Sequence, residues 1–183
     1  KKAGLWQEGM KLSINISPRQ FRRDAFANDV IATLDKYPVP ENSLDMEITE
    51  GIVIQRVDDA IATMTILNDR GISFSLDDFG TGYSSISYLK RLPVSTLKID
   101  QGFVRDIIED RNDRVLVETI ITMGRLLDME LVAEGVEDQE QLDILRSFGC
   151  DYYQGFLYSR AVPIDEFEAI LAREKHPEPE LGA

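Results

Sequence analysis

Short apolar runs alternate with longer amphipathic stretches along the whole chain. Six of these runs are rich in Ile, Val, Leu, Phe or Tyr, a composition and length typical of buried β-strands. The six predicted strands occupy residues 11–17, 44–49, 72–79, 96–100, 130–136 and 151–157. We therefore expect the fold to contain a sheet whose strands are largely shielded from water.

The segments between the runs carry apolar residues at helical spacing. The predicted helices occupy residues 19–37, 57–70, 84–91, 113–128, 138–148 and 164–173. Pro18 stands where the first turn of a helix accepts proline. Gly71 and Gly149 follow two of the periodic stretches, as helix-ending glycines do.

Regular alternation of strands and helices predicts parallel strands joined by crossover helices. Two architectures fit this pattern, an open doubly wound sheet and a closed (βα)₈ barrel. No G-x-G-x-x-G follows any predicted strand, which disfavours a dinucleotide-binding sheet. The six strand–helix units are two fewer than a complete barrel contains. We expect one domain over residues 1–173 and a flexible tail over 174–183, where Pro and charged residues accumulate.

Polar side chains stand late in each predicted strand. They are Asn15, Glu47, Glu50, Asp77, Asp78, Lys98, Asp100, Glu134, Glu137 and Gln154. Because parallel barrel strands converge with their carboxyl ends on one rim, these side chains are predicted to share a single site. The alternative for each acidic residue is a helix N-cap. Asp77, Asp78, Glu47 and Lys98 favour the site, because a charge among apolar residues is costly unless it is paired.

The segment DDFGTGYSS (77–85) begins with two adjacent carboxylates, which repel each other unless a proton or cation lies between them. A carboxylate shared by two metal ions is one solution. Lys98 has three interpretations: a structural ion-pair partner, a Schiff-base nucleophile as in barrel aldolases, or a group that holds a water. The surrounding carboxylates disfavour the Schiff base, because they keep the ammonium charged.

Composition narrows the chemistry further. The 33 acidic residues outnumber the 20 basic ones and give a formal charge of −13, which argues against binding to polymeric nucleic acid or to an anionic membrane surface. The one histidine, His176, lies in the predicted tail, so a histidine-dependent triad or zinc site is excluded. Carboxylate-rich sites favour Mg²⁺ or Mn²⁺. The single Cys150 excludes an internal disulfide, and no apolar stretch is long enough to span a membrane, so we expect a cytoplasmic location.

Six motifs in this order and spacing resemble the EAL domain of bacterial cyclic di-GMP phosphodiesterases. They are NIS, EITE, DDFGTGYSS, LKID, AEGVE and QGF, and the resemblance covers residues 11–171. It implies a (βα)₈ TIM-like barrel of the EAL type, with about six of its eight units in this chain. It also implies hydrolysis of cyclic di-GMP to linear pGpG, with two Mg²⁺ or Mn²⁺ ions as cofactors.

The resemblance also implies a role for each candidate residue. Asn15, Glu47 and Asp77 resemble ligands of a first metal, and Asp77 with Asp78 resembles the bridge to a second. Lys98 resembles a water-orienting residue, Glu134 a metal-site carboxylate and base, and Gln154 a residue that positions water or ligand. Glu50 resembles the residue that holds the DDFGTGYSS loop, while Asp100 and Glu137 resemble supporting residues.

Further expectations concern the rest of the protein. The resemblance places the namesake Glu-Ala-Leu motif and two strands upstream of Lys1, and the activity of this segment alone depends on them. It implies a homodimer and an upstream GGDEF or sensory domain. One possible arrangement is a membrane-anchored protein of which this domain is the cytoplasmic part. The main alternative function is a non-catalytic cyclic di-GMP receptor or interaction module, and a barrel aldolase is a more distant one.

Overall fold

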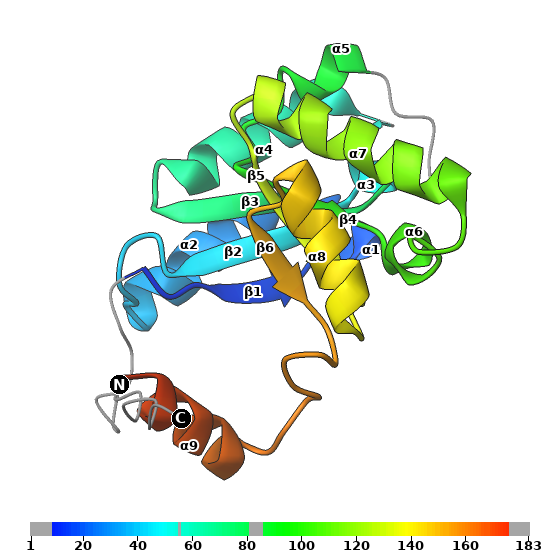
Figure 1. Cartoon of the computed structure of the whole chain (residues 1–183). Helices are drawn as coiled ribbons and strands as arrows, with labels where there is room; N and C mark the ends of the chain where they lie inside the picture. The colour runs from blue at the N-terminus through cyan, green and yellow to red at the C-terminus, as the bar shows by residue number, and fades with distance from the viewer. Residues whose placement is uncertain (1–8, 55, 81–85, 176–183) are drawn as a thin grey trace.

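A computed structural model describes residues 9–54, 56–80 and 86–175 of the chain, and its main body is a curled sheet flanked by helices (Figure 1). The six strands are β1 (Leu12–Asn15), β2 (Leu44–Thr49), β3 (Ile72–Phe79), β4 (Thr96–Ile99), β5 (Glu130–Glu134) and β6 (Tyr152–Gln154). All neighbouring pairs are parallel, and their order in the sheet is the order in the chain. The predicted (βα)₈ class is therefore confirmed, as a half-barrel of six units.

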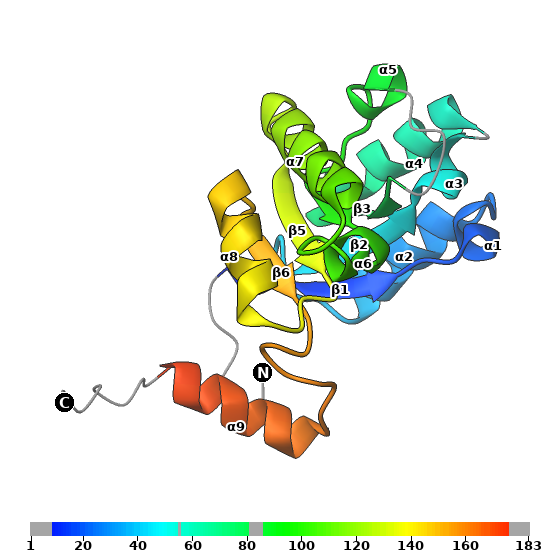
Figure 2. The ribbon, with the colours of Figure 1, turned by 45° about the vertical axis from the view of Figure 1, so that its right-hand side comes forward.

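The helices of the described residues follow the strands in turn. They are α1 (Pro18–Phe21), α2 (Phe26–Lys36), α3 (Glu50–Ile54), α4 (Val57–Asn68), α5 (Ile86–Leu89), α6 (Gln101–Arg105), α7 (Arg111–Leu126), α8 (Gln139–Phe148) and α9 (Ile164–Lys175). Figure 2 shows the curvature of the sheet from a second side, and in both views α9 lies apart from the other helices. No helix of the described ranges is long and apolar enough to cross a membrane.

Alternate residues of each central strand build the core on the outer face of the sheet. Met46 and Ile48 of β2, Phe74 and Leu76 of β3, and Leu97 of β4 are buried against the helices. Helix α7 lies so close to the sheet that a Cβ at Gly124 would be 2.7 Å from the Leu131 side chain. This packing fixes the strands, and their carboxyl ends with them.

Several boundaries differ from the sequence-based expectation. The predicted helix 19–37 is two helices, α1 and α2, separated by residues 22–25. The first begins at Pro18, where Ser17 and Gln20 form a capping box. The sixth strand ends at Gln154 rather than at residue 157. Helix α9 continues to Lys175, two residues beyond the predicted end of this helix, and residues 176–183 of the expected tail lie outside the described residues.

Candidate functional site

The carboxyl ends of the strands meet at one rim, as the sequence predicts. Asn15 ends β1 beside Glu47 of β2, and Glu134 ends β5 beside Gln154 of β6. Asn15 and Gln154 are exposed on the two edge strands, whereas Glu47 is buried. The rim therefore combines carboxylates in its centre with an amide at each side.

Lys98 is the centre of this arrangement. Its Nζ lies 2.7 Å from Oε1 of Glu134, 2.8 Å from Oε1 of Glu47 and 3.0 Å from Oδ1 of Asp77. Only 6% of the lysine side chain is exposed. Burial lowers its pKa, but hydrogen bonds and attraction from these carboxylates more than compensate and raise the pKa above its ordinary value. The ammonium is thus permanently charged at neutral pH, which argues against a Schiff-base nucleophile.

Asp77 and Asp78 reach the same site although they are neighbours in a strand. Successive strand residues normally point to opposite faces. Here Asp78 has a left-handed backbone with φ of 54°, and the β3–β4 register shifts between Leu76 and Phe79. Backbone conformations of this kind cost free energy and are concentrated at functional sites. As a result, ligand atoms of Asp77, Asp78 and Glu134 all lie within 4.8 Å of one another.

The electrostatics of these carboxylates point to a cation. Burial, and then repulsion from Asp77 and Asp100, raises the pKa of Asp78. Burial also raises the pKa of Glu134, against the lowering effect of Lys98. Asp77 Oδ1 is buried and accepts no hydrogen bond from the described residues, although Lys98 Nζ is near. One ammonium therefore does not fully satisfy this group of acids.

The remaining candidates stand around this centre. Glu50 begins α3, is buried, and accepts a hydrogen bond of 2.6 Å from the hydroxyl of Tyr88. Asp100 is the N-cap of α6 and accepts a bond from the amide of Gly102 at 2.8 Å, so the cap interpretation holds for this residue. Glu137 is exposed before α8 and makes no ion pair with a described residue. Residues 81–85 of the predicted loop lie outside the described residues.

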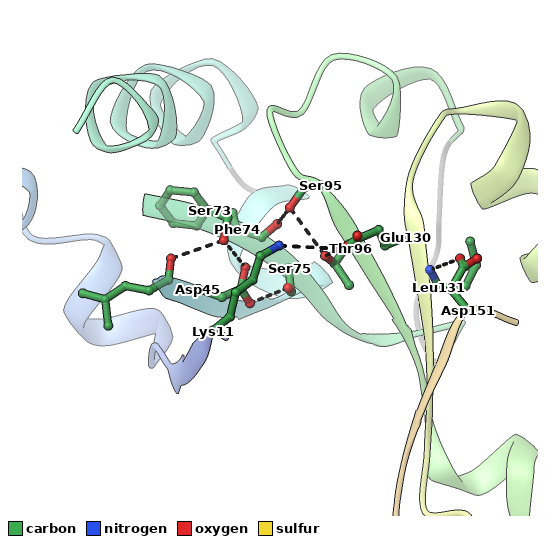
Figure 3. A network of polar contacts seen from close by, with 11 residues as sticks. Lys11, Asp45, Ser73, Phe74, Ser75, Ser95, Thr96, Glu130, Leu131 and Asp151 are labelled. Atoms are coloured by element: carbon green, nitrogen blue, oxygen red, sulfur yellow. Dashed lines mark hydrogen bonds and ion pairs between the residues drawn. The ribbon is translucent and has the colours of Figure 1, made fainter. Parts of the chain in front are cut away.

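A polar layer beneath the rim was not predicted from the sequence. A cavity of about 300 Å³ lies on the concave face of the sheet. Its lining residues are Gly9, Lys11, Ser13, Asp45, Glu47, Ser75, Thr96, Lys98, Glu130, Val132, Tyr152 and Gln154. Figure 3 shows the polar contacts there, including those of Asp45 with two serines and the ion pair of Lys11 with Glu130. The sequence did contain a signal for this layer, because polar residues recur at every second position of two strands. They are Asp45 and Glu47 on one strand and Ser73, Ser75 and Asp77 on the next.

Known proteins resemble this chain over most of its length. It is 37% identical over 172 residues to the bifunctional diguanylate cyclase/cyclic di-GMP phosphodiesterase MucR of Pseudomonas aeruginosa, covering 92% of this chain and 25% of MucR. It is 36% identical over 164 residues to the cyclic di-GMP phosphodiesterase NbdA of the same organism, covering 90% of this chain and 21% of NbdA. The chain thus spans about a quarter of the length of these relatives.

Solved structures show the same fold. The phosphodiesterase of MucR in complex with c-di-GMP superimposes with a TM-score of 0.82 at 38% identity, over 86% of this chain and 64% of that one. The EAL domain of DcpA from Mycobacterium smegmatis gives a TM-score of 0.84 at 39% identity, over 89% of this chain and 73% of that one. The family model of the EAL domain matches residues 1–161. With its strand order and its acidic rim, the chain belongs to the EAL domain family.

Proposed function

We propose that the rim site hydrolyses one phosphodiester bond of cyclic di-GMP to give linear pGpG, in a reaction that depends on Mg²⁺ or Mn²⁺. Relatives named as cyclic di-GMP phosphodiesterases support the substrate class. The observation that carries the proposal is the grouping of Asp77, Asp78 and Glu134 beside the charged Lys98. An acidic pocket repels a phosphodiester unless cations reverse the local field, so this group of acids implies metal.

The donor set fits such ions. Carboxylate oxygens are the ligands that Mg²⁺ and Mn²⁺ prefer, and the buried Asp77 Oδ1 faces an ammonium, at 3.0 Å, that it shares with Glu47 and Glu134. We infer that Asn15, Glu47, Asp77, Asp78 and Glu134 are the residues that would hold two ions. When bound, the ions would neutralise carboxylate charge and help water to ionise and the leaving oxygen to depart.

The protein's own groups supply the remaining chemistry. The Lys98 ammonium is held at the rim by three carboxylates. Where a bound metal takes one of these carboxylates, the N–H group that it leaves would orient the attacking water. Glu134 accepts the proton of that water, and its raised pKa suits a general base better than that of an exposed carboxylate. The water oxygen bonds to phosphorus as the bond to the departing 3′ oxygen breaks, and that oxygen takes a proton from solvent to leave as a hydroxyl, while Glu134 later gives the proton that it accepted back to solvent. Gln154 positions water or ligand from the edge strand.

Three residues support this centre in the proposal. Glu50, held by Tyr88, connects the start of the segment that follows β2 to α5, the helix that comes after the DDFGTGYSS segment in the chain. Asp100 caps α6 and lies close enough to Asp78 to raise the pKa of that second aspartate. Glu137 lies in the turn that leads into α8, where its amide donates to Gln141 at 2.8 Å. We further propose a cytoplasmic homodimer within a larger signalling protein that contains a GGDEF or sensory domain.

The test is turnover of cyclic di-GMP by the protein with its natural flanking sequence, followed by chromatography of the nucleotides. We expect pGpG with Mg²⁺ or Mn²⁺, loss of product in Lys98→Ala and Glu134→Ala, and unchanged turnover in Lys90→Ala, which removes an exposed lysine. Binding of cyclic di-GMP without any turnover would contradict the proposal and identify the domain as a receptor.

A further inference from the structure

The inner face of the sheet below the rim is polar. Barrels of this class usually fill their interior with Val, Ile and Leu. In this chain the corresponding positions on β2, β3 and β4 are Asp45, Ser73, Ser75 and Thr96, of which Asp45, Ser75 and Thr96 are buried. Burying polar groups does not by itself stabilise the fold, because each group loses its hydrogen bonds to water. A buried polar layer directly under the site therefore indicates a functional role.

Asp45 is the charged member of this layer. It is 3% exposed, and each of its carboxylate oxygens accepts a serine hydroxyl, Oδ1 from Ser73 at 2.8 Å and Oδ2 from Ser75 (Figure 3). Among the described residues no cation lies within ion-pair distance of it. A buried carboxylate held only by neutral donors is an expensive feature, and it stands two residues before Glu47.

Ser75 connects Asp45 to the site. It is the register partner of Glu47 on the adjacent strand, so the two side chains are neighbours on the concave face, and both line the cavity that Lys98 also lines. A serine hydroxyl has one proton to donate. Because Asp45 receives that proton, none is left for Glu47, whose Oε1 receives the ammonium of Lys98 at 2.8 Å instead.

We propose that Asp45 is a positioning residue for the metal site: by taking the Ser75 proton it keeps the Glu47 carboxylate free for Lys98 and the metal. This inference rests on the proposed function for the identity of the site, but it concerns the chain's own hydrogen bonds. Asp45 touches neither substrate nor metal in this account. Its effect passes through Ser75 to Glu47.

The first test is Asp45→Asn. The asparagine amide can donate to Ser75 Oγ, which releases the serine proton toward Glu47 and makes it compete with Lys98. We expect Mn²⁺ binding to the substrate-free protein, measured by electron paramagnetic resonance, to weaken about 10-fold, the usual scale for partners of a metal ligand. We expect kcat to fall by a similar factor while KM for cyclic di-GMP stays within about 2-fold. Glu130→Gln is the matched control, because it removes a carboxylate from the same cavity without touching Ser75; it should change neither value.

The second test separates positioning from simple structural support. Ser75→Ala removes the competing proton, so the double variant Asp45→Asn/Ser75→Ala should recover most of the lost Mn²⁺ affinity. A structural role predicts the opposite, a double variant at least as impaired as the single one. Mn²⁺ affinity unchanged in Asp45→Asn, or no recovery in the double variant, overturns the inference. If the wild type binds no Mn²⁺, the proposed function fails. The inference is then decided by crystal structures, in which Glu47 must leave Lys98 in Asp45→Asn and stay beside it in the double variant.

Discussion

Replacing Lys98 by methionine is expected to separate the stability of the rim from its chemistry. Methionine is similar in length and apolar, so it fills the same space without the charge. Glu47, Asp77 and Glu134 then lose the ammonium that lies within 3.0 Å of an oxygen of each, and their charges repel one another. Removing one partner of a buried ion pair costs about 3–5 kcal/mol, and each kcal/mol lowers the unfolding midpoint of a domain of this size by about 2–4 °C. In chelator, the midpoint should therefore fall by roughly 6–20 °C.

The loss should depend on pH and on metal. Lys98 lowers the pKa of Glu134, so its removal raises that pKa further above the unfolded value. A raised pKa contributes stability at acid pH that is lost as the pH rises through it. The deficit of Lys98→Met should thus be smallest at acid pH and grow as the pH rises through the pKa of Glu134. Divalent metal can replace the missing charge, and Mn²⁺ at about 100 times its dissociation constant should restore about 2.7 kcal/mol.

The assay is differential scanning calorimetry with and without EDTA, with turnover measured in parallel. Lys90→Met, at an exposed position, is the control and should change the free energy of unfolding by less than about 0.5 kcal/mol. Turnover should vanish in Lys98→Met even where Mn²⁺ restores its stability. A Lys98→Met protein as stable as the wild type in EDTA at pH 8 would show that the three carboxylates are not held around this lysine.

Further predictions concern the surrounding structure and the ligand. Tyr88→Phe should lower the free energy of unfolding by about 1–3 kcal/mol, because the buried Glu50 loses a donor at 2.6 Å; urea titration measures this. Gly155→Ala should lower the free energy of unfolding by at least about 3 kcal/mol, since its Cβ would lie 2.0 Å from the backbone carbonyl oxygen of Val136. Gly51→Ala, whose Cβ would have nothing within 4 Å, should instead stabilise its helix by about 0.5–1 kcal/mol. Burial raises the pKa of Cys150 to about 11, so alkylation at pH 8 should be on the order of 100-fold slower than for free cysteine, and equal rates would contradict its burial. Calorimetry should show cyclic di-GMP binding at least roughly 10-fold weaker in EDTA than in Mg²⁺.

The sequence was sufficient to predict the six strands and the gathering of polar side chains at their carboxyl ends, because both depend on local patterns. Short runs rich in Ile, Leu, Met and Phe mark β2 and β3, which were predicted with the bounds that they have. Charged side chains near the carboxyl ends of these strands are expected to lie at the shared rim. The contacts of Lys98 with Glu47, Asp77 and Glu134 follow from this convergence.

Other features depend on geometry that a pattern does not encode. The five-residue helices α3 and α6 are too short for a helical repeat of apolar residues to be recognised in the sequence. Asp100, as an N-cap, was a usable signal for α6. Two adjacent aspartates on one face require the left-handed Asp78 and a shifted register, which appear only in three dimensions. The hydrogen bonds of Ser75 and Asp45 depend on the register of β2 with β3, which single-strand patterns leave open.

The acids beside Lys98 are proposed to form a metal-dependent site for cyclic di-GMP, and anomalous diffraction from crystals grown with Mn²⁺ and cyclic di-GMP would reveal such a site. We expect manganese peaks within coordination distance of Asp77, Asp78 and Glu134, next to a phosphodiester group of the dinucleotide. Manganese bound elsewhere, or a dinucleotide bound with no metal beside these carboxylates, would contradict it.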